Sequence, residues 1–169
     1  LDYVLSSVNI NTNMTISAGT AIGWFKPSGT TWAVHLADKT SISFNGRLDA
    51  PDYFVRTSTA QEGNTGWGTG LSGFGIEGSQ NAGSGNVALS SEIDMNFTTM
   101  TGFVGYDQQF RDNNGYLTVR ANNSTLAGGN VVGYDISLYL TNCLMDNQQV
   151  GQIAGLAGNE VYLRNCTLH

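Results

Sequence analysis

The segment 107–115 contains charged side chains that could perform chemistry. Asp107, Arg111 and Asp112 lie within it, and Arg120 follows further on. Several carboxylates can hold a calcium ion, and a basic arginine can lie beside the substrate, which would make a carboxylate–guanidinium site. The alternative is a polar turn between two strands, whose charges are solvated and structural. We expect the turn and assign no catalytic residue there.

A second group of charges surrounds Pro51. It contains Arg47, Asp49, Asp52 and Arg56, with the two carboxylates on either side of the proline. Hydrolysis of a glycoside needs two carboxylates at a defined separation. Acidic residues flanking a proline are, however, far more typical of a turn. We expect structural charges that form a small ion network on one loop.

Aromatic residues offer a different chemistry, because an exposed ring can stack on the face of a sugar. Trp67 borders a glycine-rich stretch, and Tyr116, Tyr139 and Tyr162 are each followed by leucine. These four are the predicted carbohydrate-binding residues. Each has a structural alternative: Trp67 could anchor its loop, and the tyrosines could stack on one another and stiffen an outer face.

The histidines and cysteines do not have the spacing of a metal site. His35 lies in the alternating run Trp32–Leu36, which predicts a strand, and no second histidine is near it. The spacing of zinc ligands is absent, so we expect no metal and no cofactor. Two cysteines are too few for a disulfide scaffold. We expect Cys143 and Cys166 to be buried free thiols, and a single disulfide between them is the alternative.

The composition narrows the fold class and the partners. Charged residues make up 12% of the 169 residues, and there are 22 glycines. A chain poor in Lys and Glu but rich in Asn, Thr and Gly favours strands and turns over helices. The net charge is −6 and the basic residues are scattered, which argues against nucleic acid as a partner. No apolar run is long enough for membrane insertion.

An internal repeat would place these residues relative to one another. The segment Leu140–Asp146 aligns without gaps with Leu163–His169, at an offset of 23 residues. The Tyr-Leu pair recurs at the same interval, at Tyr116, Tyr139 and Tyr162. A repeat of this length, built from short strands and Gly/Asn turns, predicts a solenoid. We predict a parallel β-helix with roughly 23 residues per coil.

In such a fold, equivalent residues of successive coils lie above one another, about 4.8 Å apart. Leu117, Leu140 and Leu163 would then face inward, and the adjacent tyrosines outward. Asn142 and Asn165 would occupy bends, with amide hydrogen bonds from one coil to the next.

Further candidate strands are short and are separated by Gly, Asn, Asp or Pro. They are Val8–Ile10, Trp32–Leu36, Ser41–Phe44, Tyr53–Arg56, Leu71–Ile76, Asn86–Leu89, Glu92–Phe97 and Phe103–Tyr106. Loops of varying length would break the repeat upstream while preserving the coil. We expect roughly seven coils in a single domain, 1–169.

The L-x-N-C repeats at Leu140–Asp146 and Leu163–His169 resemble the pectin-lyase-like superfamily of right-handed parallel β-helices. The segments 35–38, 44–46, 54–56 and 61–63 are similar to β-helical regions of large bacterial surface proteins attached to YD-repeat (Rhs-type) modules. The resemblance implies a secreted or cell-surface location. It does not select an activity, because the superfamily includes lyases, glycosidases, esterases, adhesins and inert scaffolds.

The function expected from the sequence is a structural or adhesive extracellular β-helix. A polysaccharide-processing or carbohydrate-binding β-helix is the alternative. The last repeat stops at His169 without a cap, so we expect a fragment of a longer chain, or self-association through the ends. The alternative fold is a β-sandwich, in which Trp32–Leu36 would pair antiparallel with Ser41–Phe44.

Overall fold

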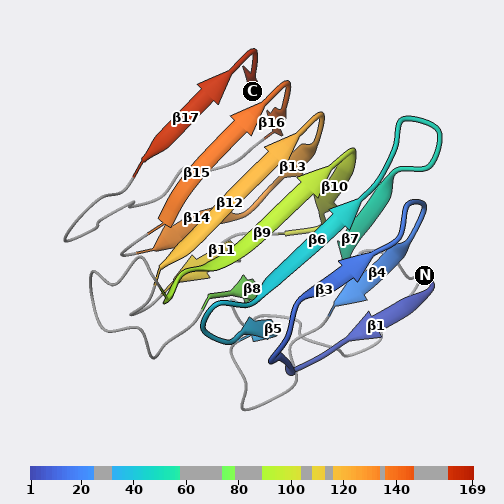
Figure 1. Ribbon diagram of the computed structural model, residues 1–169. Coiled ribbons are helices and arrows are strands. Elements are labelled where there is room, and N and C mark those ends of the chain that lie inside the picture. The colour runs from blue at the N-terminus through green and yellow to red at the C-terminus, as the bar shows by residue number, and fades with distance from the viewer. Residues whose placement is uncertain are drawn as a thin grey trace.

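The described part of the chain consists of short strands joined by turns. The computed structural model describes residues 1–24, 32–57, 74–78, 89–103, 108–112, 116–133, 136–146 and 160–169. Its strands, β1 to β18, form three open sheets in which every strand pair is parallel (Figure 1). The prediction of an all-β fold with parallel strands is confirmed.

The three sheets are named here in order along the chain. Sheet A contains β1 (Tyr3–Leu5), β4 (Ala21–Trp24), β7 (Asp52–Arg56), β10 (Thr98–Thr101), β13 (Thr125–Ala127), β16 (Leu144–Asp146) and β18 (Thr167–Leu168). Sheet B contains β2 (Val8–Ile10), β5 (Trp32–Leu36), β8 (Phe74–Glu77), β11 (Gln108–Asp112) and β14 (Asn130–Gly133). Sheet C contains β3 (Met14–Ile16), β6 (Ser41–Asn45), β9 (Ser91–Asn96), β12 (Leu117–Asn122), β15 (Ile136–Thr141) and β17 (Val161–Arg164).

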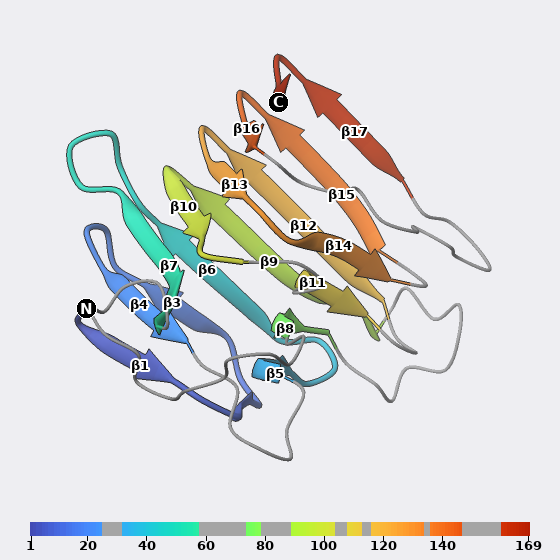
Figure 2. The same ribbon diagram turned by 180° about the vertical axis from the view of Figure 1, so that it is seen from behind.

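The chain visits the sheets in a repeating order. From β1 to β16, consecutive strands belong to A, B and C and then to A again, and one such passage is called a coil below. Strands of successive coils lie side by side, and the two termini lie at opposite ends of the row (Figures 1 and 2). This path is consistent with a β-solenoid.

The β-sandwich alternative is wrong. Strand β5 pairs with β2 and β8, and β6 pairs with β3 and β9, all in parallel, so Trp32–Leu36 and Ser41–Asn45 are not partners. The short connection between them leads from sheet B to sheet C instead of forming a hairpin.

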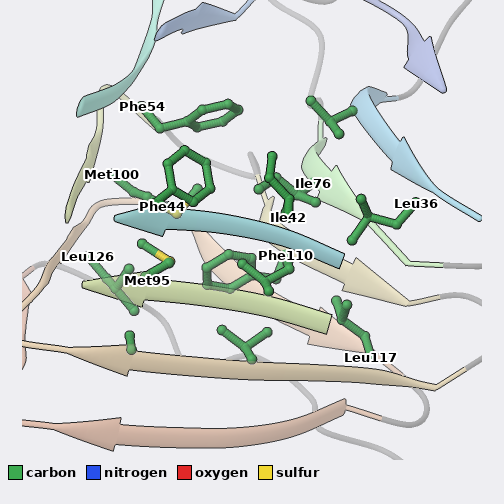
Figure 3. Packing of buried hydrophobic residues seen from close by; sticks show 14 of the residues in the cluster. Leu36, Ile42, Phe44, Phe54, Ile76, Met95, Met100, Phe110, Leu117 and Leu126 are labelled. Carbon is green, nitrogen blue, oxygen red and sulfur yellow. The ribbon is translucent and has the colours of Figure 1, made fainter. Parts of the chain in front are cut away.

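Apolar columns fill the space between the sheets. In sheet A, one column runs through Ile22, Phe54, Met100, Leu126 and Met145, each paired with the next and all buried. Figure 3 shows Phe54, Met100 and Leu126 of this column among buried side chains from the other sheets. Each such side chain contributes about 1.5–3 kcal/mol by leaving water. The columns therefore hold the three sheets together and fix which side chains face outward.

The predicted stack of three tyrosines is only partly correct. Tyr139 of β15 pairs with Tyr162 of β17, as expected. On the other side, however, Tyr139 pairs with Arg120, and Tyr116 precedes β12 and is only 5% exposed. The prediction that Tyr116 faces outward in line with the other two is therefore wrong.

The same correction applies to the leucines that precede the bends. Leu140 and Leu163 are paired, as expected. The position of Leu140 is taken one coil earlier by Ala121, whereas Leu117 pairs with Ile136. Leu117, Leu140, Ala121 and Ile136 are buried in the interior, whereas Leu163, in the last strand of sheet C, is 42% exposed.

Varying coil length explains both errors. Asn142 and Asn165 occupy equivalent bends and are 23 residues apart, but Asn123 and Asn142 are only 19 apart. The interval is 26 between Thr98 and Ser124. The period of 23 residues therefore holds for the last coil alone, and extending it upstream shifts the alignment.

The bend between sheets C and A contains the predicted asparagine ladder. Asn142 and Asn165 have φ values of 53° and 51°. Asn165 Nδ2 donates to Asn142 Oδ1 at 3.3 Å, and Asn142 Nδ2 donates to Asn123 Oδ1 at 3.2 Å. Asparagine tolerates this left-handed conformation better than most residues. The prediction is confirmed, and the ladder extends by one further coil to Asn123.

The other strand predictions have mixed outcomes. Val8–Ile10 and Trp32–Leu36 agree with β2 and β5, and the runs beginning at Ser41, Tyr53 and Glu92 agree with β6, β7 and β9 to within a residue. The predictions over 71–73, 86–88 and 104–106 lie outside the described residues, as does most of the glycine-rich stretch. Leu89 and Phe103, which are described, are not part of a strand.

The turn expected within 107–115 is wrong where it can be compared. Gln108–Asp112 forms β11, which pairs with β8 and β14 in sheet B. Phe110 is fully buried and pairs with Ile76, so burial of a single aromatic ring outweighs the polar composition of the segment.

Candidate carbohydrate-binding face

The outer face of sheet C brings together acidic, basic and aromatic side chains. One outward row runs through Asp94, Arg120, Tyr139 and Tyr162, one from each of the strands β9, β12, β15 and β17. Glu92 lies two residues before Asp94, on the same face of β9. Alternation along each strand turns these side chains outward while their neighbours pack in the core.

Arg120 is at the centre of this face. Its Nη1 lies 3.5 Å from Glu92 Oε2 and 3.8 Å from Asp94 Oδ1. The guanidinium carbon lies 5.8 Å from the centre of the Tyr139 ring. All four side chains are partly exposed, so each ion pair contributes little to stability, at most about 1 kcal/mol. The contacts hold the guanidinium between two carboxylates and a ring.

Tyr139 is oriented by a second carboxylate. Its hydroxyl donates to Glu160 Oε2 at 2.5 Å. This hydrogen bond is the main reason why the pKa of Tyr139 is raised, because it stabilises the protonated phenol. Tyr162, the next ring in the row, is 56% exposed. The face therefore presents two aromatic rings beside positively and negatively charged groups that can form hydrogen bonds.

The surroundings of Asp94 on this face change its protonation. Partial burial raises its pKa, and the repulsion from Glu92 acts in the same direction, whereas the attraction of Arg120 lowers it. Burial disfavours the charged form, which explains the net direction. A carboxyl group with a raised pKa can serve as a proton donor or acceptor toward a bound hydroxyl.

Two of the four residues predicted to bind carbohydrate lie on this face. Tyr139 and Tyr162 are there, Tyr116 is buried at the start of β12, and Trp67 lies outside the described residues. The sequence analysis missed Glu92, Asp94 and Arg120 as members of the site. Alternation within β9 and β12 could have turned them outward, but only the correct coil lengths bring them beside Tyr139.

The first charged group predicted from the sequence is split between two sheets. Arg111 and Asp112 belong to sheet B, whereas Arg120 belongs to sheet C, so they do not form one site. Asp107 lies outside the described residues.

The charges around Pro51 do not form one loop network either. Arg47 and Asp49 make an exposed ion pair of 3.2 Å. Asp52 and Arg56 belong to β7 and are buried, and Asp52 Oδ1 accepts a hydrogen bond from the backbone of Thr20 at 3.0 Å.

A second polar cluster lies on sheet B. The Glu77 side chain is only 1% exposed, and its two oxygens lie 3.4 Å from His35 Nδ1 and 4.0 Å from Arg111 Nε. The expectation that His35 is a strand residue is confirmed. The cluster ties together β5, β8 and β11, where burial of an unpaired carboxylate would be costly.

Metal and membrane signatures were also sought in the described ranges. No group of three or more His, Cys, Asp or Glu residues there could hold a metal ion. No helix among these residues is long and apolar enough to cross a membrane.

The chain matches no protein-family model, and no curated protein or solved structure is significantly similar to it.

Proposed function

We propose that the chain is a stretch of right-handed parallel β-helix that serves as an adhesive scaffold at a cell surface or in the extracellular space. We further propose that it binds polysaccharide through the outer face of sheet C. The cyclic order of three parallel sheets supports the β-helix, since crossovers between parallel strands are right-handed in nearly all proteins. The L-x-N-C repeats, which resemble pectin-lyase-like proteins, support the surface location.

The scaffold role is supported by the continuity of the strand ladders. From β1 to β16 each sheet adds one strand per coil, and the sheet A column from Ile22 to Met145 is apolar throughout. Repeat proteins of this kind form stiff, elongated bodies whose faces present extended binding surfaces. A flat outer face can therefore contact successive units of a long polymer.

The observation that carries the binding proposal is the row Arg120–Tyr139–Tyr162. The rings would stack on sugar faces, while Arg120, Glu92 and Asp94 would exchange hydrogen bonds with hydroxyl or carboxylate groups. Polar groups set around aromatic rings are typical of sites that fix both the position and the orientation of a ligand.

A panel of acidic and neutral polysaccharides tests this proposal by affinity electrophoresis, followed by calorimetry on any that bind. The double variant Tyr139→Ala/Tyr162→Ala should weaken binding at least about tenfold, which is about 1.4 kcal/mol. Tyr53→Ala is the matched control, because Tyr53 is similarly exposed on sheet A. Failure to bind any polysaccharide, or an equal loss in the control, would refute the proposal.

Turnover of the polysaccharide is a second candidate, favoured by the two carboxylates beside Arg120. In that case Asp94 would act as the acid or base, in keeping with its raised pKa. Absorbance of unsaturated products and a reducing-end assay, each with and without calcium, would detect it. Asp94→Asn should abolish turnover but retain binding, and an unchanged rate in this variant would eliminate the assignment.

Exposed apolar side chains at the two ends of an interior column support self-association of the β-helix through its ends. Tyr3 and Leu168 occupy the first and last places of the column that contains Phe54, and they are 62% and 61% exposed. A cavity of about 350 Å³ opens beside β1 and is lined by Leu5, Met14 and Ile16 among others. Light scattering over a concentration series should show association that Leu168→Asp abolishes.

A further inference from the structure

The two cysteines belong to a column of polar residues at the bend that enters sheet A. Thr98 pairs with Asp52, and the pairings of the following strands place Ser124, Cys143 and Cys166 at the same level in successive coils. This column lies next to the asparagine ladder, one residue further along the chain. The sequence repeat aligns the two cysteines but does not show how the thiols are directed.

The two thiols have matching surroundings. Each Sγ donates to the carbonyl two residues before it, at 3.3 Å for Cys143 and 3.4 Å for Cys166. Each also donates, at 3.4 Å, to a carbonyl of the preceding coil, from Ala121 and Leu140 respectively. The asparagine before each cysteine has nearly the same φ. The thiols therefore point in the same direction and are related by a shift of one coil, about 4.8 Å.

The parallel direction of the two thiols favours a bridging metal ion over a disulfide bond. A disulfide needs Cβ atoms about 3.5–4.5 Å apart and converging side chains. A two-coordinate metal ion in line with two sulfur atoms separates them by two metal–sulfur bonds, or about 4.6 Å if each bond is about as long as the 2.3 Å of a zinc–thiolate bond. Parallel thiols one coil apart fit the second requirement without rotation of either side chain.

We propose that Cys143 and Cys166 form a binding site for a soft, two-coordinate metal ion, with Cu(I) as the ion that it would take. Soft thiolate ligands select Cu(I), zinc and iron–sulfur clusters, and the last two are usually held by four ligands, so a pair of thiolates suits Cu(I) best. On binding, the two thiols release two protons to solvent, and the ion bridges two thiolates in a complex of net charge −1. No electron is transferred. The site lies at the bend between sheets C and A, apart from the proposed polysaccharide face.

Release of protons from the thiols explains how the site would respond to pH. Cys143 is 3% exposed and Cys166 is partly exposed. The bound cation supplies the charge that favours the thiolate, and binding must therefore weaken as the pH falls.

Anaerobic titration with Cu(I), in competition with a Cu(I) chelator that changes colour on binding, tests the site. One ion should bind per chain. Cys143→Ser and Cys166→Ser should each weaken binding at least about a hundredfold, because chelation by the second thiol is lost. Both variants should fold, since Ser124 already occupies this position one coil earlier and its Oγ donates to Asn122 O at 2.8 Å.

Metal binding should be restored when the pair of cysteines is moved by one coil toward the N-terminus. Ser124→Cys combined with Cys166→Ser places two thiols at adjacent levels again and should restore binding to within about tenfold of the original protein. Retention of tight binding in either single serine variant would overturn the proposal, as would failure of the rescue in a folded protein. Rapid formation of a Cys143–Cys166 disulfide by oxidised glutathione in the folded chain would also overturn it, because it would show converging thiols.

Discussion

Replacement of Phe54 by alanine tests whether the apolar columns carry the stability of the fold. Phe54 lies between Ile22 and Met100 in the sheet A column and is fully buried. Its ring is stacked on Trp24 at 6.3 Å and meets Phe44 edge-on at 6.0 Å. The substitution removes these contacts and leaves a cavity between the sheets.

The expected loss follows from these contacts. Replacing a buried phenylalanine by alanine costs about 3–5 kcal/mol through lost transfer energy and the cavity. Because two aromatic partners lose their contact with the ring, we expect a value in the upper half of that range, about 4–5 kcal/mol. Tyr53→Ala, on the same strand but 42% exposed on the outer face, should cost less than about 1 kcal/mol.

Urea unfolding of the two variants, followed by circular dichroism, measures the difference. The Phe54→Ala midpoint should fall well below that of Tyr53→Ala. Similar losses would refute the assignment of inward and outward faces to β7, and with it the register of sheet A. A second transition in either variant would show that the coils unfold separately, as repeat arrays can.

Substitutions at three further positions test the bends and the buried carboxylate of β7. Asn142→Ala should cost about 1–2 kcal/mol, since φ is 53° and ladder hydrogen bonds are lost, whereas Asn142→Gly should cost less; equal losses in urea unfolding would contradict this. Gly46→Ala should cost at least about 2 kcal/mol by the same measurement, because an added Cβ would lie 2.5 Å from Phe97 O, and an unchanged midpoint would disprove the close approach. Burial raises the pKa of Asp52 above 3.8, so its stabilising contribution is complete below 3.8 and is lost as the pH rises through the raised value. Asp52→Asn should flatten this loss in unfolding series from acidic to neutral pH, and identical profiles for the two proteins would exclude the effect.

The sequence predicted the fold best where the chain repeats without insertion. Leu140–Asp146 and Leu163–His169 align residue by residue, and they coincide with the last two coils of sheets C and A. There the repeat alone predicted the parallel pairing of Tyr139 with Tyr162 and the asparagine ladder. The physical reason is that equal coil length keeps equivalent side chains in register.

The candidate site could not be assembled in the same way. Stacking requires only that inward and outward residues alternate, and it places no constraint on the length of the connections. The sequence therefore contains no direct signal that Arg120 pairs with Tyr139 across an interval of 19 residues, the same interval as that between Asn123 and Asn142. Strand β11 was missed for a related reason, since only Phe110 in a polar segment marks its inward face.

Backbone pairing alone sets the pitch of the outer face of sheet C. Ser43, Asp94, Arg120, Tyr139 and Tyr162 stand in one row, although unequal lengths of chain separate them. The side chains of this row therefore lie about 4.8 Å apart, whatever the length and composition of the connections between the strands. Tyrosine in place of Ser43, Asp94 and Arg120 would extend a line of rings over five coils, so binding groups could be engineered there at a period chosen in advance.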